Sequence, residues 1–261
     1  MIKAIIFDLD DTLLWDNRSI NEAFAATCTY ASNITGVDPD ELEEAVKSEA
    51  KKLYASYETY EFTKLIGINP FEGLWGEFLD EHDFFPKLKE IVPSYRKKAW
   101  KNGLLKFEVN DEQLATELAN LFINERRSKP YTYEETFKIL DQLKGNYQLL
   151  LLTNGSPHLQ NSKLTLTPQL SPYFDEIIIS GDFGKGKPDQ EIFKYALSKL
   201  NVNVNEAIMI GDNLMTDILG ANRAGIKSVW INRNNQKYDQ VIPNYEINSL
   251  EELHRILEMI N

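Results

Sequence analysis

Cysteine and histidine are scarce in this chain of 261 residues, which contains one cysteine and three histidines. A single cysteine cannot form a disulfide within the chain, which fits a reducing compartment. Cys28 lies between small residues without an obvious partner, and we expect it to be buried as a small hydrophobic side chain. His82, His158 and His254 are far apart and lack the spacing of metal ligands, so we expect them to be structural or at the surface.

Long hydrophobic runs and basic residues are also few. No apolar run approaches the roughly 20 residues that a membrane helix needs, and acidic residues follow the first short run too closely for a secretory signal. The formal net charge is −12 at pH 7, so long-range attraction to a nucleic acid would have the wrong sign. We expect a cytoplasmic protein, monomeric or homodimeric, that binds neither a membrane nor a nucleic acid.

Short runs of Ile, Leu and Val recur along the chain and are bounded by Gly, Asn or Asp. Such near-continuous apolar runs are typical of strands in a parallel sheet that is buried on both faces. Helical patterns lie between them, and this alternation predicts right-handed crossovers. The expected strands are 3–7, 147–153, 176–180, 207–211 and 227–231, and the expected helices are 132–144, 189–200 and 216–224. We predict a Rossmann-like three-layer α/β sandwich with a mostly parallel sheet.

Residues 16–129 have helical periodicity and lack strand runs. The chain is long enough for a core domain with a smaller inserted one. We therefore predict an α/β core formed by residues 1–15 and 130–261, with a helical domain inserted at 16–129. The insert is rich in aromatic residues. We expect most of them in its own core, and the remainder to line a substrate pocket.

Two acids follow the first apolar run. Asp8 and Asp10 share a side in an extended chain, so they could face one ligand. Like charges that close favour a cation or a proton between them. An acidic turn at a strand end is the simpler alternative, and the pair alone does not separate the two readings. Asp11 points the other way in an extended chain, and we expect it to be solvated.

The second expected strand ends in Thr153, Asn154 and Gly155. The threonine hydroxyl and the backbone amides of the next two residues could bind a phosphate. Asn-Gly is primarily a turn signal, so this segment taken alone fits a polar turn better than a phosphate site.

Residues 181–187 match the spacing of a nucleotide-binding P-loop, but Pro188 stands where a P-loop has Ser or Thr. Proline offers neither a hydroxyl for magnesium nor an N–H, so we reject this assignment. We expect Pro188 to be the first residue of the next helix. Lys187 would then lie at the mouth of the sheet, where its ammonium could neutralise a phosphoryl group. We expect Lys185 to be a solvated loop lysine.

Asp212 emerges directly from the fourth expected strand. Thr216 has the position of a helix N-cap, which would place Asp217 in the first turn, where it could simply offset the helix dipole. Magnesium prefers oxygen ligands and keeps several waters, so Asp8, the Asp10 carbonyl and Asp212 would form a sparse site. An anionic substrate on an anionic protein also requires local positive charge, which predicts a metal requirement.

In this order, the four segments resemble those of the haloacid dehalogenase (HAD) superfamily, and specifically its phosphatases. The helical insert has the position of the cap in subfamily I. The likeness extends to the phosphatases that act on N-acylneuraminate 9-phosphate and their bacterial relatives, through residues 149–155 and 229–232. The motifs are Asp8-x-Asp10-x-Thr12, Thr153-Asn154-Gly155, Lys187-Pro188-Asp189, and Gly211-Asp212 with Asp217.

The resemblance implies that Asp8 is a nucleophile that becomes an aspartyl phosphate. It implies that Asp10 protonates the leaving alcohol and later activates water. It also implies that Thr153, Asn154 and Lys187 bind the phosphoryl group. It further implies that Asp8, Asp10 and Asp212 bind Mg²⁺. Thr12, Gly155 and Asp217 would support the residues of the site.

The resemblance predicts a magnesium-dependent phosphatase for a small phosphorylated metabolite. Sugar phosphates, phosphoserine, phosphoglycolate and nucleoside monophosphates are the expected substrates. Dehalogenases and phosphonate-cleaving members lack an acid at the position of Asp10, which argues against both activities. A phosphomutase and a non-catalytic binding protein of the same fold remain as alternatives. Trp15 and Asn17 lie at the expected hinge into the cap, where one of them could touch substrate.

Overall fold

A computed structural model describes residues 1–237 and 240–261 of the chain. The chain divides into two compact units. The α/β unit comprises Met1–Trp15, Thr132–Gly155 and Lys163–Asn261, and the helical unit comprises Asp16–Tyr131 and Ser156–Ser162. Each unit is described by itself below.

The α/β unit contains a six-stranded sheet with the strand order β3-β2-β1-β4-β5-β6. Every pairing between neighbouring strands is parallel. The strands are β1 (Ala4–Phe7), β2 (Gln148–Thr153), β3 (Glu176–Ile179), β4 (Ala207–Gly211), β5 (Lys227–Ile231) and β6 (Tyr245–Ile247). The five strands expected from the sequence are confirmed. We missed β6 because its three residues include a central glutamate and form no apolar run.

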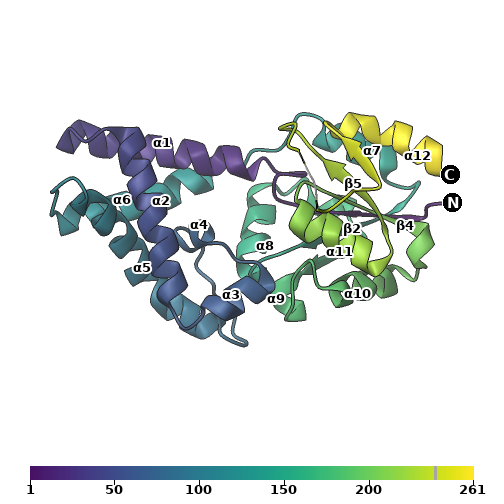
Figure 1. Ribbon diagram of the computed structural model, residues 1–261, viewed down its shortest axis with the longest axis horizontal. Helices are drawn as coiled ribbons and strands as arrows, with labels where there is room; N and C mark the ends of the chain where they lie inside the picture. Colours follow the sequence, from purple (N-terminus) through teal and green to yellow (C-terminus); the bar gives the residue numbers. More distant parts are fainter. Residues whose placement is uncertain (238–239) are drawn as a thin grey trace. The chain divides into compact units, whose positions relative to one another are not determined.

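Helices cover both faces of this sheet. The helices of the α/β unit are α7 (Thr136–Leu143), α9 (Ser180–Phe183), α10 (Gln190–Leu200), α11 (Leu219–Ala224) and α12 (Leu253–Ile260), while α8 (Pro157–Leu166) begins in the helical unit and ends in the α/β unit. In β1, Ile5 and Phe7 pack in the core that contains α7 and α12, whereas Ala4 and Ile6 pack in the core that contains α10 and α11. Figure 1 shows these two helix pairs on opposite sides of the strands. The predicted three-layer α/β architecture is confirmed.

Two predicted helix starts are wrong. Asp189 caps α10 by accepting a hydrogen bond from the Glu191 N–H at 2.9 Å, so Pro188 lies before the helix instead of opening it. The helix expected to begin at Thr216 is preceded by a π-helical turn, Leu214–Ile218. Asn213 caps that turn. In both cases a carboxylate or amide side chain satisfies the free N–H groups of the first turn earlier or later than the pattern suggested.

The helical unit is built from six helices and a core of aromatic side chains. The helices are α1 (Asp16–Thr35), α2 (Pro39–Ser56), α3 (Tyr60–Ile66), α4 (Pro70–Gly73), α5 (Phe85–Leu105) and α6 (Glu112–Ser128). Phe24, Trp100 and Phe122 pack together at the centre. Cys28 is fully buried in the same core, as expected. The aromatic residues of the insert thus serve mainly as its hydrophobic core.

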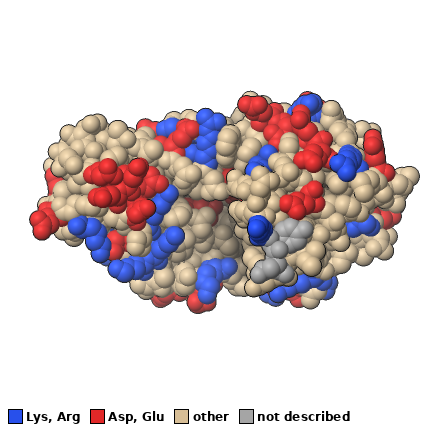
Figure 2. Space-filling model, turned by 45° about the horizontal axis from the view of Figure 1, so that its top comes forward, with Lys and Arg blue, Asp and Glu red and all other residues tan. Residues whose placement is uncertain are grey.

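The surface charge is mixed on a local scale. On the face drawn in Figure 2, acidic and basic side chains lie beside one another. An exposed ion pair within α1 joins Arg18 and Glu22 at 2.7 Å. Pairs of this exposed kind contribute about 1 kcal/mol or less. Among the described residues, no helix combines the length and hydropathy needed to cross a membrane.

Gly220 on α11 lies where this helix packs closely against α10. A Cβ at this position would collide with the Phe193 ring and lie 3.1 Å from the Cα of Pro188. We expect Gly220→Ala to lower the free energy of unfolding by about 1–3 kcal/mol, because overpacking outweighs the gain in helix propensity. Denaturant titration followed by circular dichroism measures this change. Arg223→Ala, on the exposed side of α11, should change stability by about 0.5 kcal/mol at most. A Gly220→Ala protein as stable as its parent would contradict this packing.

Candidate active site

The candidate site lies at the carboxyl ends of the parallel strands, where ligands bind in open α/β sheets. The central strand β1 pairs with both β2 and β4, so residues that follow these three strands are neighbours. Asp8 follows β1 directly and is 7% exposed. Its backbone N–H donates to the Ile210 carbonyl at 2.9 Å, which continues the ladder of the sheet. The sheet therefore fixes the backbone of Asp8.

The chain turns after Asp10, so the extended geometry that we assumed for Asp11 is wrong. The backbone of Asp11 is left-handed, with a φ of 60°, which is uncommon for a residue other than glycine. Asp11 is half-buried instead of solvated. Burial, followed by the charges of Asp217, Asp8 and Asp11, raises the pKa of Asp212 well above its ordinary value. Asp11 thus contributes to the electrostatics of the site.

Lys187 is buried between two acids. Its ammonium lies 2.5 Å from Asp8 Oδ1 and 2.7 Å from Asp217 Oδ1. It also donates to the Leu152 carbonyl at 2.7 Å. Burial alone would lower the pKa of Lys187, but the charges of Asp217 and Asp8 raise it above its ordinary value. Lys187 therefore carries a positive charge at neutral pH.

The loop after β2 holds the backbone of Lys187. Asn154 Oδ1 accepts a hydrogen bond from the Lys187 N–H at 2.8 Å, and Asn154 Nδ2 donates to the Lys187 carbonyl at 2.9 Å. The Gly155 N–H donates to Ser180 Oγ at 2.8 Å. That donor is therefore not available for the anion nest that we expected from Gly155. Thr153 ends β2 and is 1% exposed.

Asp212 follows β4 directly, and three neighbours fix its position. The Trp230 indole N–H donates to the Asp212 carbonyl at 2.7 Å, and Thr12 Oγ1 donates to Asp212 Oδ1 at 3.5 Å. Gly211 precedes Asp212, and a Cβ on Gly211 would collide with the Asp217 carboxylate. This close approach requires glycine at the end of β4.

Asp217 comes from the π-helical turn and is 1% exposed. Its Oδ2 accepts a hydrogen bond from the Asn213 N–H at 3.0 Å, while its Oδ1 pairs with Lys187. Since both oxygens have partners, Asp217 does more than offset a helix dipole: it orients the ammonium of Lys187.

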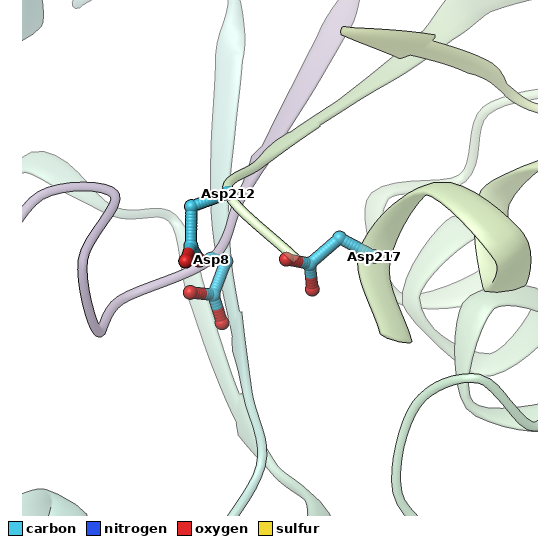
Figure 3. A group of neighbouring side chains, drawn as sticks. All are labelled: Asp8, Asp212 and Asp217. Atoms are coloured by element: carbon cyan, nitrogen blue, oxygen red, sulfur yellow. The ribbon is translucent and has the colours of Figure 1, made fainter. Parts of the chain in front are cut away.

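Three carboxylates converge at the centre of the site (Figure 3). One oxygen from each of Asp8, Asp212 and Asp217 lies within 4.8 Å of the others. Burial raises the pKa of Asp8 to about 6, although Lys187 opposes this rise and Asp217 adds to it. Buried like charges at this separation favour a proton or a cation among them.

The charges of the site fit a magnesium ion. Three carboxylates surround one buried lysine, which leaves an excess of two negative charges when all three acids are ionised. Carboxylate oxygens are ligands that Mg²⁺ prefers. Because Asp217 is occupied by Lys187 and a backbone N–H, Asp8 and Asp212 are the carboxylates best suited to hold the ion.

We did not predict the second lysine of the site from the sequence. Lys163 lies on α8, is 4% exposed, and places its Nζ 2.7 Å from Asp10 Oδ2. A signal was present, because Lys163 stands four residues after Leu159 and next to Leu164. In a helix this spacing puts the lysine on the apolar face. We did not predict a helix at residues 157–166, and we therefore did not recognise Lys163 as a charged residue on an apolar helix face.

The two hinge residues have different surroundings. Trp15 is 37% exposed and stacks on Tyr133 in the α/β unit, with 5.1 Å between ring centroids. Asn17 is exposed in the first turn of α1 in the helical unit. Contact of either residue with a substrate stays a prediction.

Comparison with known proteins supports the sequence interpretation. The chain is 31% identical over 256 residues to phosphoserine phosphatase from Thermus thermophilus, with 97% of this chain and 98% of the relative covered. It is 26% identical over 265 residues to human N-acylneuraminate-9-phosphatase, with 100% and 95% covered.

The fold matches solved structures as well. The putative HAD-hydrolase YfnB from Bacillus subtilis, determined with magnesium bound, has a TM-score of 0.66 and 23% identity, with 98% of each chain covered. Structures of 2-haloacid dehalogenases share this fold too. The model of the haloacid dehalogenase-like hydrolases matches residues 2–225. The chain therefore belongs to the haloacid dehalogenase-like hydrolase family.

Proposed function

We propose that this protein is a magnesium-dependent phosphatase that hydrolyses a small phosphorylated metabolite through an aspartyl phosphate on Asp8. The observation that carries the proposal is the separation of the two acids by their partners. Asp8 is bonded to Lys187, and Asp10 is bonded to Lys163. Asp8 thus lies beside a cation that could also bind the phosphoryl group, whereas Asp10 is held by a different lysine. The phosphatase names of two relatives that match nearly the whole chain agree with this assignment.

In the first step, an oxygen of Asp8 attacks phosphorus, and the bond between phosphorus and the substrate oxygen breaks. Asp10 gives its proton to the leaving alkoxide, which departs as the alcohol. Lys187 and the Thr153 hydroxyl stabilise the negative charge on the phosphoryl oxygens. Asp217 and Asn154 keep Lys187 in place, through its ammonium and its backbone respectively.

In the second step, Asp10 accepts a proton from a water molecule as that water attacks the phosphorus of the aspartyl phosphate. The bond between phosphorus and the Asp8 oxygen breaks, which releases inorganic phosphate and restores the carboxylate. Asp10 again carries a proton and is ready for the next substrate. Splitting the hydrolysis into two displacements lowers the barrier of each.

Asp8, Asp212 and the backbone carbonyl of Asp10 would hold Mg²⁺. When bound, the ion would neutralise charge on the carboxylates and on the phosphoryl group. Thr12 and Trp230 would act indirectly, because they bond Asp212, and Gly211 would do so because it leaves room for the Asp217 carboxylate.

We further propose that the helical unit is the cap of the enzyme and contributes to substrate choice. The relatives of this chain differ in substrate by name: phosphoserine phosphatase, N-acylneuraminate-9-phosphatase and glyceraldehyde 3-phosphate phosphatase each match at least 97% of this chain. These names support a small phosphorylated metabolite as substrate, and they do not single out one compound.

The role of Asp8 is tested by Asp8→Asn, which removes the nucleophilic carboxylate at constant size. We expect hydrolysis of para-nitrophenyl phosphate with Mg²⁺ to fall at least about 10³-fold, since enzymes typically accelerate reactions by far more than this. Asp111→Asn is the matched control. It makes the same chemical change at the N-cap of α6, where asparagine still caps the helix, and its activity should equal that of the parent. Residual activity in Asp8→Asn near the parent level would exclude the mechanism.

The assigned Mg²⁺ ligands and the raised pKa of Asp8 predict that the Mg²⁺-induced rise in Tm depends on pH. Asp8 in the metal-free fold has a pKa of about 6, above its ordinary value of 3.8. The folded state therefore binds more protons than the unfolded state, and the stability of the metal-free protein falls as pH rises through this window. We expect Mg²⁺ to raise Tm more at pH 7.5 than at pH 5, because protons compete with the ion at the lower pH.

Differential scanning fluorimetry with and without Mg²⁺ at both pH values measures this effect. In Asp212→Asn the Mg²⁺-induced shift should largely disappear at both pH values. Equal shifts at pH 5 and pH 7.5, or an unchanged response in Asp212→Asn, would contradict the assigned ligands.

A screen of phosphorylated metabolites tests the substrate class. Sugar phosphates, phosphoserine, phosphoglycolate and nucleoside monophosphates should be compared at micromolar concentrations and ranked by kcat/KM. We expect one class to exceed the others by at least about 100-fold, which corresponds to about 2.7 kcal/mol. Transfer of phosphate between two positions of one sugar, with little release of inorganic phosphate, would indicate a mutase instead.

A further inference from the structure

Lys163 is a buried charge that the two displacement steps do not use. Its side chain is 4% exposed, and its Nζ lies 2.7 Å from Asp10 Oδ2. Moving an ammonium out of water costs several kcal/mol unless a partner of opposite charge offsets it. A leucine or methionine would fill the same face of α8 beside Leu159 and Leu164 at no such cost. The lysine therefore needs a reason beyond packing.

The position of Lys163 on its helix does not supply that reason. A lysine in the last turn of a helix interacts favourably with the helix dipole, but it does so from the surface with its ammonium in water. Lys163 instead reaches a carboxylate 153 residues away in the sequence, in the turn after β1. Thr167 Oγ1, which donates to the Lys163 carbonyl at 2.7 Å, occupies one of the carbonyls at this helix end.

We propose that Lys163 is a positioning residue for Asp10, and that it is needed where the leaving alcohol must be protonated. The inference rests on the proposed function, in which Asp10 is that acid. The turn that carries Asp10 is not part of a strand, so the sheet does not fix its side chain as it fixes Asp8. The side chain of Asp10 is 26% exposed, and a partly exposed carboxylate can sample several rotamers. The bond from Lys163 restricts this freedom, which keeps Asp10 within reach of the leaving oxygen.

This role differs in its consequences from that of Lys187. Lys187 contacts Asp8, so its loss affects every substrate at the phosphorus centre. Lys163 contacts Asp10, so its loss affects a substrate in proportion to its need for a proton. An alkyl phosphate needs one because an alkoxide is a poor leaving group, whereas 2,4-dinitrophenyl phosphate releases a stable phenolate without one.

The test compares kcat/KM of these two kinds of substrate in Lys163→Met, which keeps the length of the side chain and removes its charge. The alkyl phosphate is phosphoserine, or the one that the metabolite screen ranks first. We expect kcat/KM for the alkyl phosphate to fall about 10- to 100-fold, within the usual range for general acid catalysis. For 2,4-dinitrophenyl phosphate, kcat/KM should stay within about threefold of the parent value. The ratio kcat/KM is used because it reports the step in which the alcohol leaves, before Asp10 activates water.

A double-mutant cycle tests whether Lys163 acts through Asp10. Asp10→Asn should show the same preference for the dinitrophenyl substrate. Adding Lys163→Met to Asp10→Asn should change kcat/KM by no more than about twofold, because the acid that Lys163 positions is already absent. Lys163→Arg, which keeps a buried donor with positive charge, should restore part of the alkyl phosphatase activity. Lys138→Met, at an exposed lysine paired with Glu251, is the matched control and should behave like the parent.

Three results would overturn the inference: equal losses on both substrates, no loss on either, or losses that multiply in the double mutant. The Mg²⁺-induced rise in Tm verifies that each variant retains a folded site. If Lys163→Met does not fold, Lys163→Leu, which also removes the donor and fills the same face of α8, takes its place in the same comparison. Failure of the proposed function is a separate outcome, because the parent would then hydrolyse neither substrate in an Asp8-dependent manner.

Discussion

The buried ammonium of Lys187 is the interaction on which the rest of the site depends. It lies within hydrogen-bond distance of Asp8, Asp217 and the Leu152 carbonyl. Neither carboxylate could be buried as an anion without it, since an unpaired buried charge costs several kcal/mol. The dependence is mutual, because the two acids also keep the lysine charged. Three segments that are far apart in sequence are thereby held together at one end of the sheet.

The residues around this ion pair fix it through the backbone. Asn154 bonds both the N–H and the carbonyl of Lys187, so the loop after β2 determines where the lysine backbone lies. Gly211 leaves room for the Asp217 carboxylate, which a larger residue would displace. A nucleophile and a phosphoryl-binding cation need placement within a fraction of an ångström. Strand ends and short polar loops provide it here more rigidly than long loops would.

The sequence was sufficient to predict the parallel sheet and the acids at its edge, because apolar runs and strand ends leave strong local patterns. The sequence was not sufficient to predict contacts between residues that are far apart in the chain. The pairing of Lys163 with Asp10 joins residues that no pattern connects. The turn after β1 was misread because an extended geometry was assumed one residue too far, and Asp11 consequently appeared solvated. Thr216 was taken as a helix cap although Asn213 is an equally good candidate, and Pro188 was taken as the start of α10 because proline favours the first helical position.

The fold by itself does not decide the chemistry, since 2-haloacid dehalogenases share it. A carboxylate nucleophile serves displacement at carbon as well as at phosphorus, but a halide leaves without a proton whereas an alkoxide does not. The distinguishing feature is therefore a second acid that can give up a proton, together with whatever holds that acid in place. In this chain Asp10, the proposed second acid, has its own buried lysine, separate from the one beside Asp8, the proposed nucleophile. Under the proposed mechanism, two acids two residues apart can thus perform different tasks, because each is tied to a different cation.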